Sequence, residues 1–155
     1  MNPRVLSGAF LLLFVVAGCG GAPPAPLSAA LVSSGPAEDF VSGGSIDVVS
    51  YNEVGNQVTI EGWHMLTPKT KAQKLSVLAE GAVSVASVTS RARPDVVNAV
   101  GDEELLNSGF VLVLELRENT PLTRLCIMID DSHYGSRLLA PHLPEFPSCL
   151  ATSTG

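Results

Sequence analysis

The sequence predicts an all-β domain, a single small antiparallel β-sandwich of the Ig-like kind with about seven strands and one short crossover helix. From Gly44 onward, short runs rich in β-branched residues are separated by turn residues. Several runs alternate apolar and polar residues with a period of two, as half-buried strands do. The length of 155 residues, with 46% hydrophobic and 15% charged residues, fits one compact domain plus processing segments.

Seven runs are expected to form strands, which suits two packed sheets. They cover residues 45–51, 57–64, 74–79, 83–89, 109–116, 122–130 and 136–139. In the second run, Val58 and Ile60 alternate with polar residues, so one face is expected to be buried. The run 110–116 is apolar on both faces until Glu115, which is typical of a central strand.

The connections contain matching turn and helix signals. Residues 53–56, with Gly55 and Asn56, favour a hairpin between the first two strands. Glu80 and Gly81 are expected to turn the third strand into the fourth. In the segment 91–109, Pro94 suits a first helical turn, Asp95 opposes the helix dipole, and Gly101 can end a short helix. This crossover is expected to cap the open end of the sandwich.

The N-terminus has the shape of an export signal. Arg4 precedes an apolar run over residues 5–16 that is too short to span a membrane comfortably. The tetrapeptide Val16-Ala17-Gly18-Cys19 resembles the lipobox of bacterial lipoproteins. The resemblance implies that residues 1–18 are a lipoprotein signal peptide and that Cys19 becomes an N-terminus carrying diacylglycerol and a fatty acyl chain such as palmitate. The alternative is an ordinary secretory signal that removes Cys19.

The lipoprotein resemblance also predicts a location. An aspartate after the cysteine tends to retain such proteins in the inner membrane, but Gly20 stands there, so we expect an outer-membrane anchor facing the periplasm. Residues 19–43 are rich in Pro, Gly, Ala and Ser and are expected to form a flexible tether with a reach of roughly 75 Å. The folded domain is expected over 44–149, followed by a loose tail over 150–155.

Charge and motif content exclude several classes of function. The formal net charge is −6 and becomes −7 when the signal peptide removes Arg4. Such an acidic domain is a poor binder of nucleic acid. His64, His133 and His142 lack metal-ligand spacing, and Asp130 and Asp131 lack the ligand order of an EF-hand, so we expect no metal and no cofactor. No motif points to a catalytic residue, and the domain is expected not to be an enzyme.

A second resemblance covers residues 43–116. The segments GSID, EGWHM, RARPDVVNAVGD and NSGF occur in the order of a small β-sandwich module with the pattern G-x-x-D, GWA, R-P-D-V and SGF. That module is appended to bacterial glycosyltransferases and cell-envelope proteins. This chain has GWH in place of GWA. The resemblance implies a β-sandwich in an envelope setting, with no catalytic role to carry over.

Three residues are candidates for ligand binding. Trp63, the only tryptophan, can stack on a sugar ring if it is exposed; the alternative is that it fills the core or packs on a neighbouring strand. Arg91 and Arg93, together with Asp95, can bind a carboxylate or phosphate group; the alternative is a charge network that orients the crossover.

Two cysteines remain if Cys19 is lipidated. Cys126 lies in a predicted strand and Cys149 in the C-terminal segment, so an oxidising periplasm favours a disulfide between them. The alternative is two unpaired buried thiols.

Two functions of different class follow from these observations. The first is a lipid-anchored envelope protein whose domain serves a non-catalytic interaction or structural role with an envelope partner. The second is a glycan-binding module that uses Trp63. A hydrolytic enzyme ranks third, since it would need a site assembled from scattered residues.

Overall fold

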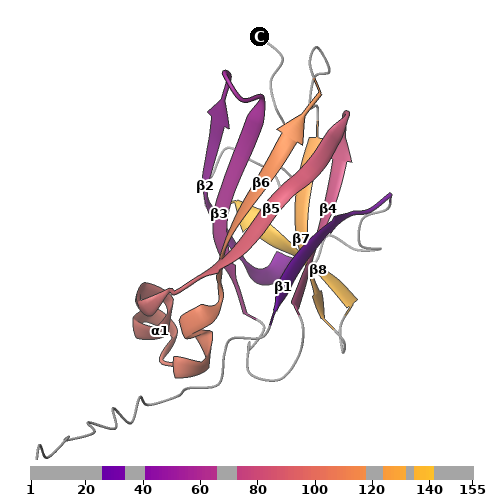
Figure 1. Cartoon of the computed structure of the whole chain (residues 1–155). Helices are drawn as coiled ribbons and strands as arrows, with labels where there is room; N and C mark the ends of the chain where they lie inside the picture. Colours follow the sequence, from indigo (N-terminus) through magenta and orange to yellow (C-terminus); the bar gives the residue numbers. More distant parts are fainter. Residues whose placement is uncertain (1–25, 34–40, 66–72, 118–123, 132–134, 142–155) are drawn as a thin grey trace, which may run out of the picture.

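The computed structural model describes residues 26–33, 41–65, 73–117, 124–131 and 135–141. These residues form one eight-stranded sheet with the order β1-β4-β7-β8-β2-β3-β6-β5, together with a short helical crossover (Figure 1). The elements are β1 (Leu27–Leu31), β2 (Val41–Asn52), β3 (Gln57–His64), β4 (Gln73–Glu80), β5 (Val83–Arg91), α1 (Pro94–Val100), η1 (Glu103–Asn107), β6 (Gly109–Leu116), β7 (Arg124–Asp131) and β8 (Gly135–Pro141).

The all-β class is confirmed, but the two-sheet sandwich is wrong. The sheet is mixed and curls until its end strands, β1 and β5, approach each other, so the domain is nearly a closed barrel. Two parallel pairings produce this shape, β1 with β4 and β2 with β8. The alternation of apolar and polar residues within a strand is the same in a sandwich and in a barrel, because it does not depend on which strands pair. The number of predicted strands therefore did not distinguish the two folds.

Strand β1 corrects the predicted tether. Residues 19–43 were expected to be flexible, yet Leu27–Leu31 pairs in parallel with β4 from Gln73 to Val77, and β2 already begins at Val41. The amide of Val32 donates to the carbonyl of Val77 at 2.9 Å and extends this pairing. Leu27 and Ala29 also pack against the core. The predicted signal peptide (1–18), Cys19 and the tail (150–155) lie outside the described residues.

All seven predicted strands are present, with shifts of a few residues at their ends. β2 and β3 form the expected antiparallel hairpin, and Asn56 has the positive φ of 46° that its turn requires. Glu80 and Gly81 do connect β4 to β5, as expected, but the two strands are not neighbours in the described sheet: β4 pairs with β1 and β7, and β5 pairs with β6. The strand that lies beside β4 there is β1, which the sequence pattern did not reveal.

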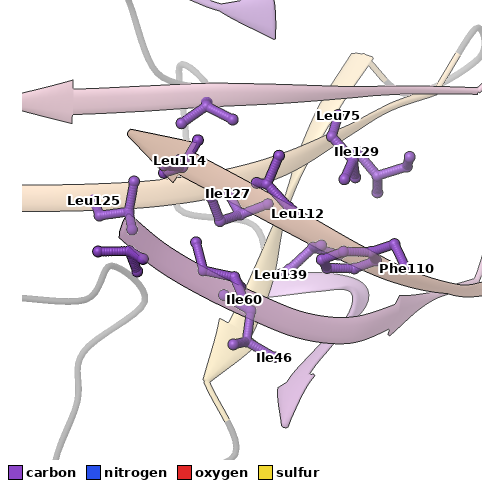
Figure 2. Close-up of a cluster of buried hydrophobic side chains, with 12 residues drawn as sticks. Ile46, Ile60, Leu75, Phe110, Leu112, Leu114, Leu125, Ile127, Ile129 and Leu139 are labelled. Carbon is purple, nitrogen blue, oxygen red and sulfur yellow. The ribbon is translucent and has the colours of Figure 1, made fainter. Parts of the chain in front are cut away.

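The core fills the inside of the barrel. Figure 2 shows Ile60, Leu112, Ile127 and Leu139 meeting from four different strands. The alternation predicted for β3 is observed, since Val58 and Ile60 face inward. β6 is an interior strand between β3 and β5, as its apolar run predicted. Its residues Phe110, Leu112 and Leu114 are completely buried.

The predicted crossover helix is confirmed as α1. Pro94 occupies the first turn and Asp95 is the acidic residue there. Gly101 ends the helix in the left-handed conformation, and its amide donates to the carbonyl of Val97. Val96 is the buried residue of the helix, and η1 then leads into β6. The crossover carries the chain from β5 to β6 at one end of the barrel (Figure 1).

Candidate functional site

A charged cleft of about 550 Å³ lies where the end of β5 and the start of α1 meet β2 and β3. Its ionisable side chains come from four elements and from the connection between β5 and α1: Asp47, Glu61, Arg91, Arg93 and Asp95. Gly62 and Phe110 also line it. The cleft thus brings together both arginines and the aspartate that the sequence singled out.

Arg93 is fixed by the chain around it. Its amide donates to the carbonyl of Leu106 at 2.6 Å, which ties the start of α1 to η1. Its Cγ lies only 2.5 Å from where a Cβ on Gly109 would stand. The glycine at the start of β6 therefore makes room for the arginine stem.

The guanidinium of Arg93 joins two carboxylates. Nε and Nη2 donate to Asp95 at 2.9 and 2.7 Å, and Nη1 donates to Oδ2 of Asp47 at 2.6 Å. Such two-pronged contacts to a carboxylate are among the stronger ion pairs of proteins. Because Asp47 belongs to β2 and Arg93 precedes α1, this contact holds the crossover against the sheet.

Arg91 forms a second, more exposed pair with Glu61 of β3. Pairs that water reaches contribute about 0 to 1 kcal/mol. Three carboxylates and two guanidiniums thus share the cleft, and each guanidinium is already bonded to a carboxylate. An anionic ligand would have to displace these bonds. The geometry matches the charge-network alternative better than the anion-binding one.

The ion pair changes the titration of Asp95. The hydrogen bond from Arg93 is the largest contribution that lowers the pKa of Asp95 to about 2, from an ordinary value of 3.8. The same hydrogen bond raises the pKa of Arg93 above its ordinary range. Since the folded-state pKa of Asp95 lies below the unfolded value, the pair stabilises the fold above pH 3.8. That contribution is lost as the pH falls through about 2.

Replacing Arg93 should raise the pKa of Asp95. In Arg93→Gln we expect the pKa of Asp95 to rise from about 2 toward 3.8, because the charged partner is gone. A carbon NMR titration of the Asp95 carboxyl measures it. Arg91→Gln is the matched control and should leave the pKa of Asp95 low, because Arg91 pairs with Glu61 instead. A wild-type pKa close to 3.8 would contradict the ion pair.

The four segments of the second resemblance meet at this cleft. GSID supplies Asp47, GWH supplies Gly62, RPD supplies Arg93 and Asp95, and SGF supplies Gly109 and Phe110. A Cβ on Gly62 would lie 2.8 Å from the ring of Phe110 and 2.3 Å from the carbonyl oxygen of Ser45. These residue types are therefore explained by packing and by the attachment of the crossover.

Trp63 lies on the outer face of β3. Its neighbours Gly62 and His64 are buried, whereas Trp63 is half-buried and shares its face with Glu61. Ser45 and Gly109 are its cross-strand partners, and both are small. The core cluster of the described barrel is built from other residues. Trp63 is thus neither a core residue nor a fully exposed platform.

A second apolar cluster lies on the outer face of β7 and β8. Cys126, Met128 and Leu138 are buried there, and the partly buried Val32 and Leu78 pack against them. Cys126 is disulfide-bonded. The other two cysteines of the chain, Cys19 and Cys149, lie outside the described residues, so the pairing of Cys126 with Cys149 stays a prediction.

Peptide mapping without reduction should find the fragments that contain Cys126 and Cys149 linked. The loop so closed is about 23 residues long and would stabilise the fold by roughly 3 kcal/mol. Mapping after reduction and alkylation is the control. A link between Cys126 and Cys19 would contradict the pairing and would also exclude a lipidated Cys19.

The β2–β3 hairpin exposes apolar residues that sequence reasoning missed. Val48, Val49 and Tyr51 near the end of β2 and Val54 in the turn are all exposed. The sequence did contain a signal, because the predicted strand 45–51 has two adjacent valines and its turn contains a valine among polar residues. Asp47 and Glu61 were likewise missed as partners of the arginines.

Among the described residues, no group of three or more His, Cys, Asp and Glu side chains is placed to hold a metal ion. Asp130 instead accepts hydrogen bonds from Ser76 and Ser136 and pairs with Lys74.

Comparison of the chain with protein families, curated proteins and solved structures gives no match. The resemblance of residues 43–116 to the envelope module therefore stays a prediction.

Proposed function

We propose that this protein is a lipid-anchored interaction domain of the bacterial cell envelope, non-catalytic, with the β2–β3 hairpin as its docking element. The observation that carries the proposal is the exposure of this hairpin: Val54 is 100%, Tyr51 55% and Val48 47% exposed. Apolar residues gathered in the open on one hairpin are typical of a protein–protein contact. Tyr51 adds an exposed aromatic side chain, a residue type that is common among interface hot spots.

Export is supported by the cysteine chemistry. Disulfides persist in oxidising compartments such as the periplasm and are rare in the cytosol. The bond at Cys126 fits the lipobox resemblance of Val16-Ala17-Gly18-Cys19, which predicts the same compartment. Within the described residues, no helix is long and apolar enough to span a membrane. The proposed attachment is the lipid on Cys19.

The position of β1 shortens the proposed tether. Only residues 20–26 separate Cys19 from Leu27, the first residue of β1, so the barrel would stay within roughly 25 Å of the lipid rather than 75 Å. Leu27 pairs with Gln73 at the start of β4, and the strand registers place this end opposite the tip of the hairpin (Figure 1). The hairpin would therefore point away from the membrane.

The second candidate, a glycan-binding module, is favoured by one observation. Trp63 is half-buried and shares the outer face of β3 with Glu61, which lines the charged cleft. Aromatic faces next to carboxylate and guanidinium groups suit sugar hydroxyls. Binding of isolated peptidoglycan sacculi that is lost in Trp63→Ala but kept in Leu106→Ala would favour this function.

The anchor is tested by Cys19→Ser in cells. We expect the wild-type protein in the membrane fraction with incorporated palmitate, and the variant without label and largely released from the membrane. Cys126→Ser is the control for the loss of any cysteine and should remain labelled. Equal membrane association and equal labelling of wild type and Cys19→Ser would exclude the lipid anchor.

The docking role is tested by photo-crosslinking in cells. A photoreactive phenylalanine in place of Tyr51 should give one reproducible adduct with an envelope protein, whereas the same probe at Ser84 on the exposed side of β5 should not. Identical adducts from both positions, or none from Tyr51, would rule out the hairpin as the docking element.

A further inference from the structure

Part of β2 has a described strand on only one of its sides. β3 accompanies β2 from Gly44 to Asn52, but β8 pairs with it only at Val41, Ser45 and Ile46. Beyond Ile46, in the part of the chain that the structure describes, residues 47–52 have a sheet partner on the β3 side alone. Backbone groups of such an edge are free to pair with another extended chain.

The side chains along this edge are unusually open for their position. Val49 and Tyr51 lie opposite Ile60 and Val58, so they share the face of the sheet that forms the core. Ile60 and Val58 are 0% and 6% exposed, whereas Val49 and Tyr51 are 37% and 55% exposed. Among the described residues, β8 pairs with β2 no further than Ile46, so no described strand lies beside Val49 and Tyr51 on this side. A strand added here would cover both residues.

Proteins usually protect an open edge with charges, prolines or very short strands. The stretch from Val48 to Asn52 contains neither a charged residue nor a proline. Charges stand only at its two ends, as Asp47 and Glu53. Asp47 is already bonded to Arg93, and no ion pair to Glu53 occurs in the described structure, so Glu53 supplies the uncompensated charge.

We propose that residues 48–52 of β2 bind an extended protein segment by strand addition, and that this segment carries a basic residue opposite Glu53. The inference rests on the proposed docking function and specifies its partner. Main-chain hydrogen bonds would supply affinity, and the exposed Val49 and Tyr51 would receive alternate apolar side chains of the partner. β2, the turn and β3 contain no Lys or Arg, so all the charged residues of the hairpin are acidic.

A second copy of this chain fits the edge less well. Two-fold pairing centred on Ser50 would align the two uncharged stretches, but it places Asp47 of one copy opposite Glu53 of the other. Like charges directly opposite each other destabilise a strand pair. Each copy also has a formal net charge of −6. Self-association is therefore an outcome that the test must exclude.

The chain after β8 is also a poor occupant of this edge. After Pro141 the sequence continues as His-Leu-Pro-Glu-Phe-Pro-Ser over residues 142–148, which lie outside the described residues. Pro144 and Pro147 have no amide hydrogen and cannot donate to a strand ladder. Occupation of the edge by this segment is a second outcome that the test must exclude.

The test uses the purified, lipidated full-length protein in detergent micelles and three synthetic peptides. The first is Lys-Val-Thr-Val-Thr-Val-Lys, an extended segment with basic ends. In the second both lysines are replaced by glutamate, and in the third the central valine is replaced by proline. Hydrogen exchange locates bound peptide, and NMR titration compares affinities.

We expect the lysine peptide to slow exchange at those amides of residues 48–52 that face away from β3, and to leave β5 unchanged. The glutamate peptide should bind about fivefold more weakly, and the proline peptide should give no protection. In Glu53→Lys the preference should reverse to the glutamate peptide. Glu103→Lys makes the same charge change on η1, away from the hairpin, and should keep the original preference.

Four results would overturn the proposal. They are the absence of protection at about 1 mM lysine peptide, equal binding of the proline peptide, protection of β5 in place of β2, and protection, already in the free protein, of those amides of 48–52 that face away from β3. In the last case, sedimentation tells a second copy from the C-terminal segment. If the peptides fail while crosslinking from Tyr51 succeeds, strand addition is wrong but the docking function stands.

Discussion

The Gly44→Ala variant is expected to lose about 3 kcal/mol or more of its free energy of unfolding. Gly44 has a φ of +139°, a conformation that residues with a Cβ rarely adopt. The added Cβ would also lie 2.0 Å from the carbonyl oxygen of Trp63, on the neighbouring strand. The unfavourable φ and the contact with the Trp63 carbonyl oxygen both involve backbone atoms, which a side-chain rotation cannot relieve. Strands β2 and β3 would therefore have to separate. Chemical denaturation of the full-length protein without reductant measures the loss.

Gly101→Ala is the matched control for this prediction. Gly101 also has a positive φ, of +81°, but no atom lies within 4 Å of the added Cβ. The variant is therefore expected to lose only about 1 kcal/mol of its free energy of unfolding, because alanine disfavours the left-handed conformation. If both variants lost the same free energy of unfolding, the close approach of β2 and β3 at Gly44 would be wrong.

Phe110→Ala is expected to destabilise the domain by about 3 to 5 kcal/mol. The ring is completely buried, belongs to the central strand β6, and fills the space in front of Gly62 (Figure 2). Its removal leaves a cavity that the rigid sheet cannot close. For a domain whose total stability is about 5 to 15 kcal/mol, this is a large fraction. Thermal and chemical denaturation should agree on it.

Leu106→Ala provides the comparison for the core substitution. Leu106 lies on η1 and is 43% exposed, so its truncation should cost below about 1 kcal/mol. Because Phe110 also lines the cleft, Phe110→Ala is expected to change the shape of the cleft as well. A loss for Phe110→Ala as small as that for Leu106→Ala would contradict the placement of the ring in the core.

The candidate site could be predicted only in part from the sequence. Arg91, Arg93 and Asp95 were recognisable because they stand together in five residues. Their partners were not, because Asp47 and Glu61 precede them by dozens of residues and meet them only when the sheet places β2, β3, β6 and β5 in this order. The exposure of Val49 and Tyr51 was equally hidden, since it depends on how far β8 pairs with β2.

The sequence by itself determined the local structure. Period-two runs located seven strands, Gly55 and Asn56 located a hairpin, and Pro94 and Gly101 located the ends of α1, because each signal acts through neighbouring residues. Only the tertiary structure decided the rest. The parallel pairing of β1 with β4 and of β2 with β8 depends on contacts distant in sequence, which leave no periodic trace. Those pairings turn the expected sandwich into a nearly closed barrel. Among the described strands, only β3 pairs with residues 48–52 of β2.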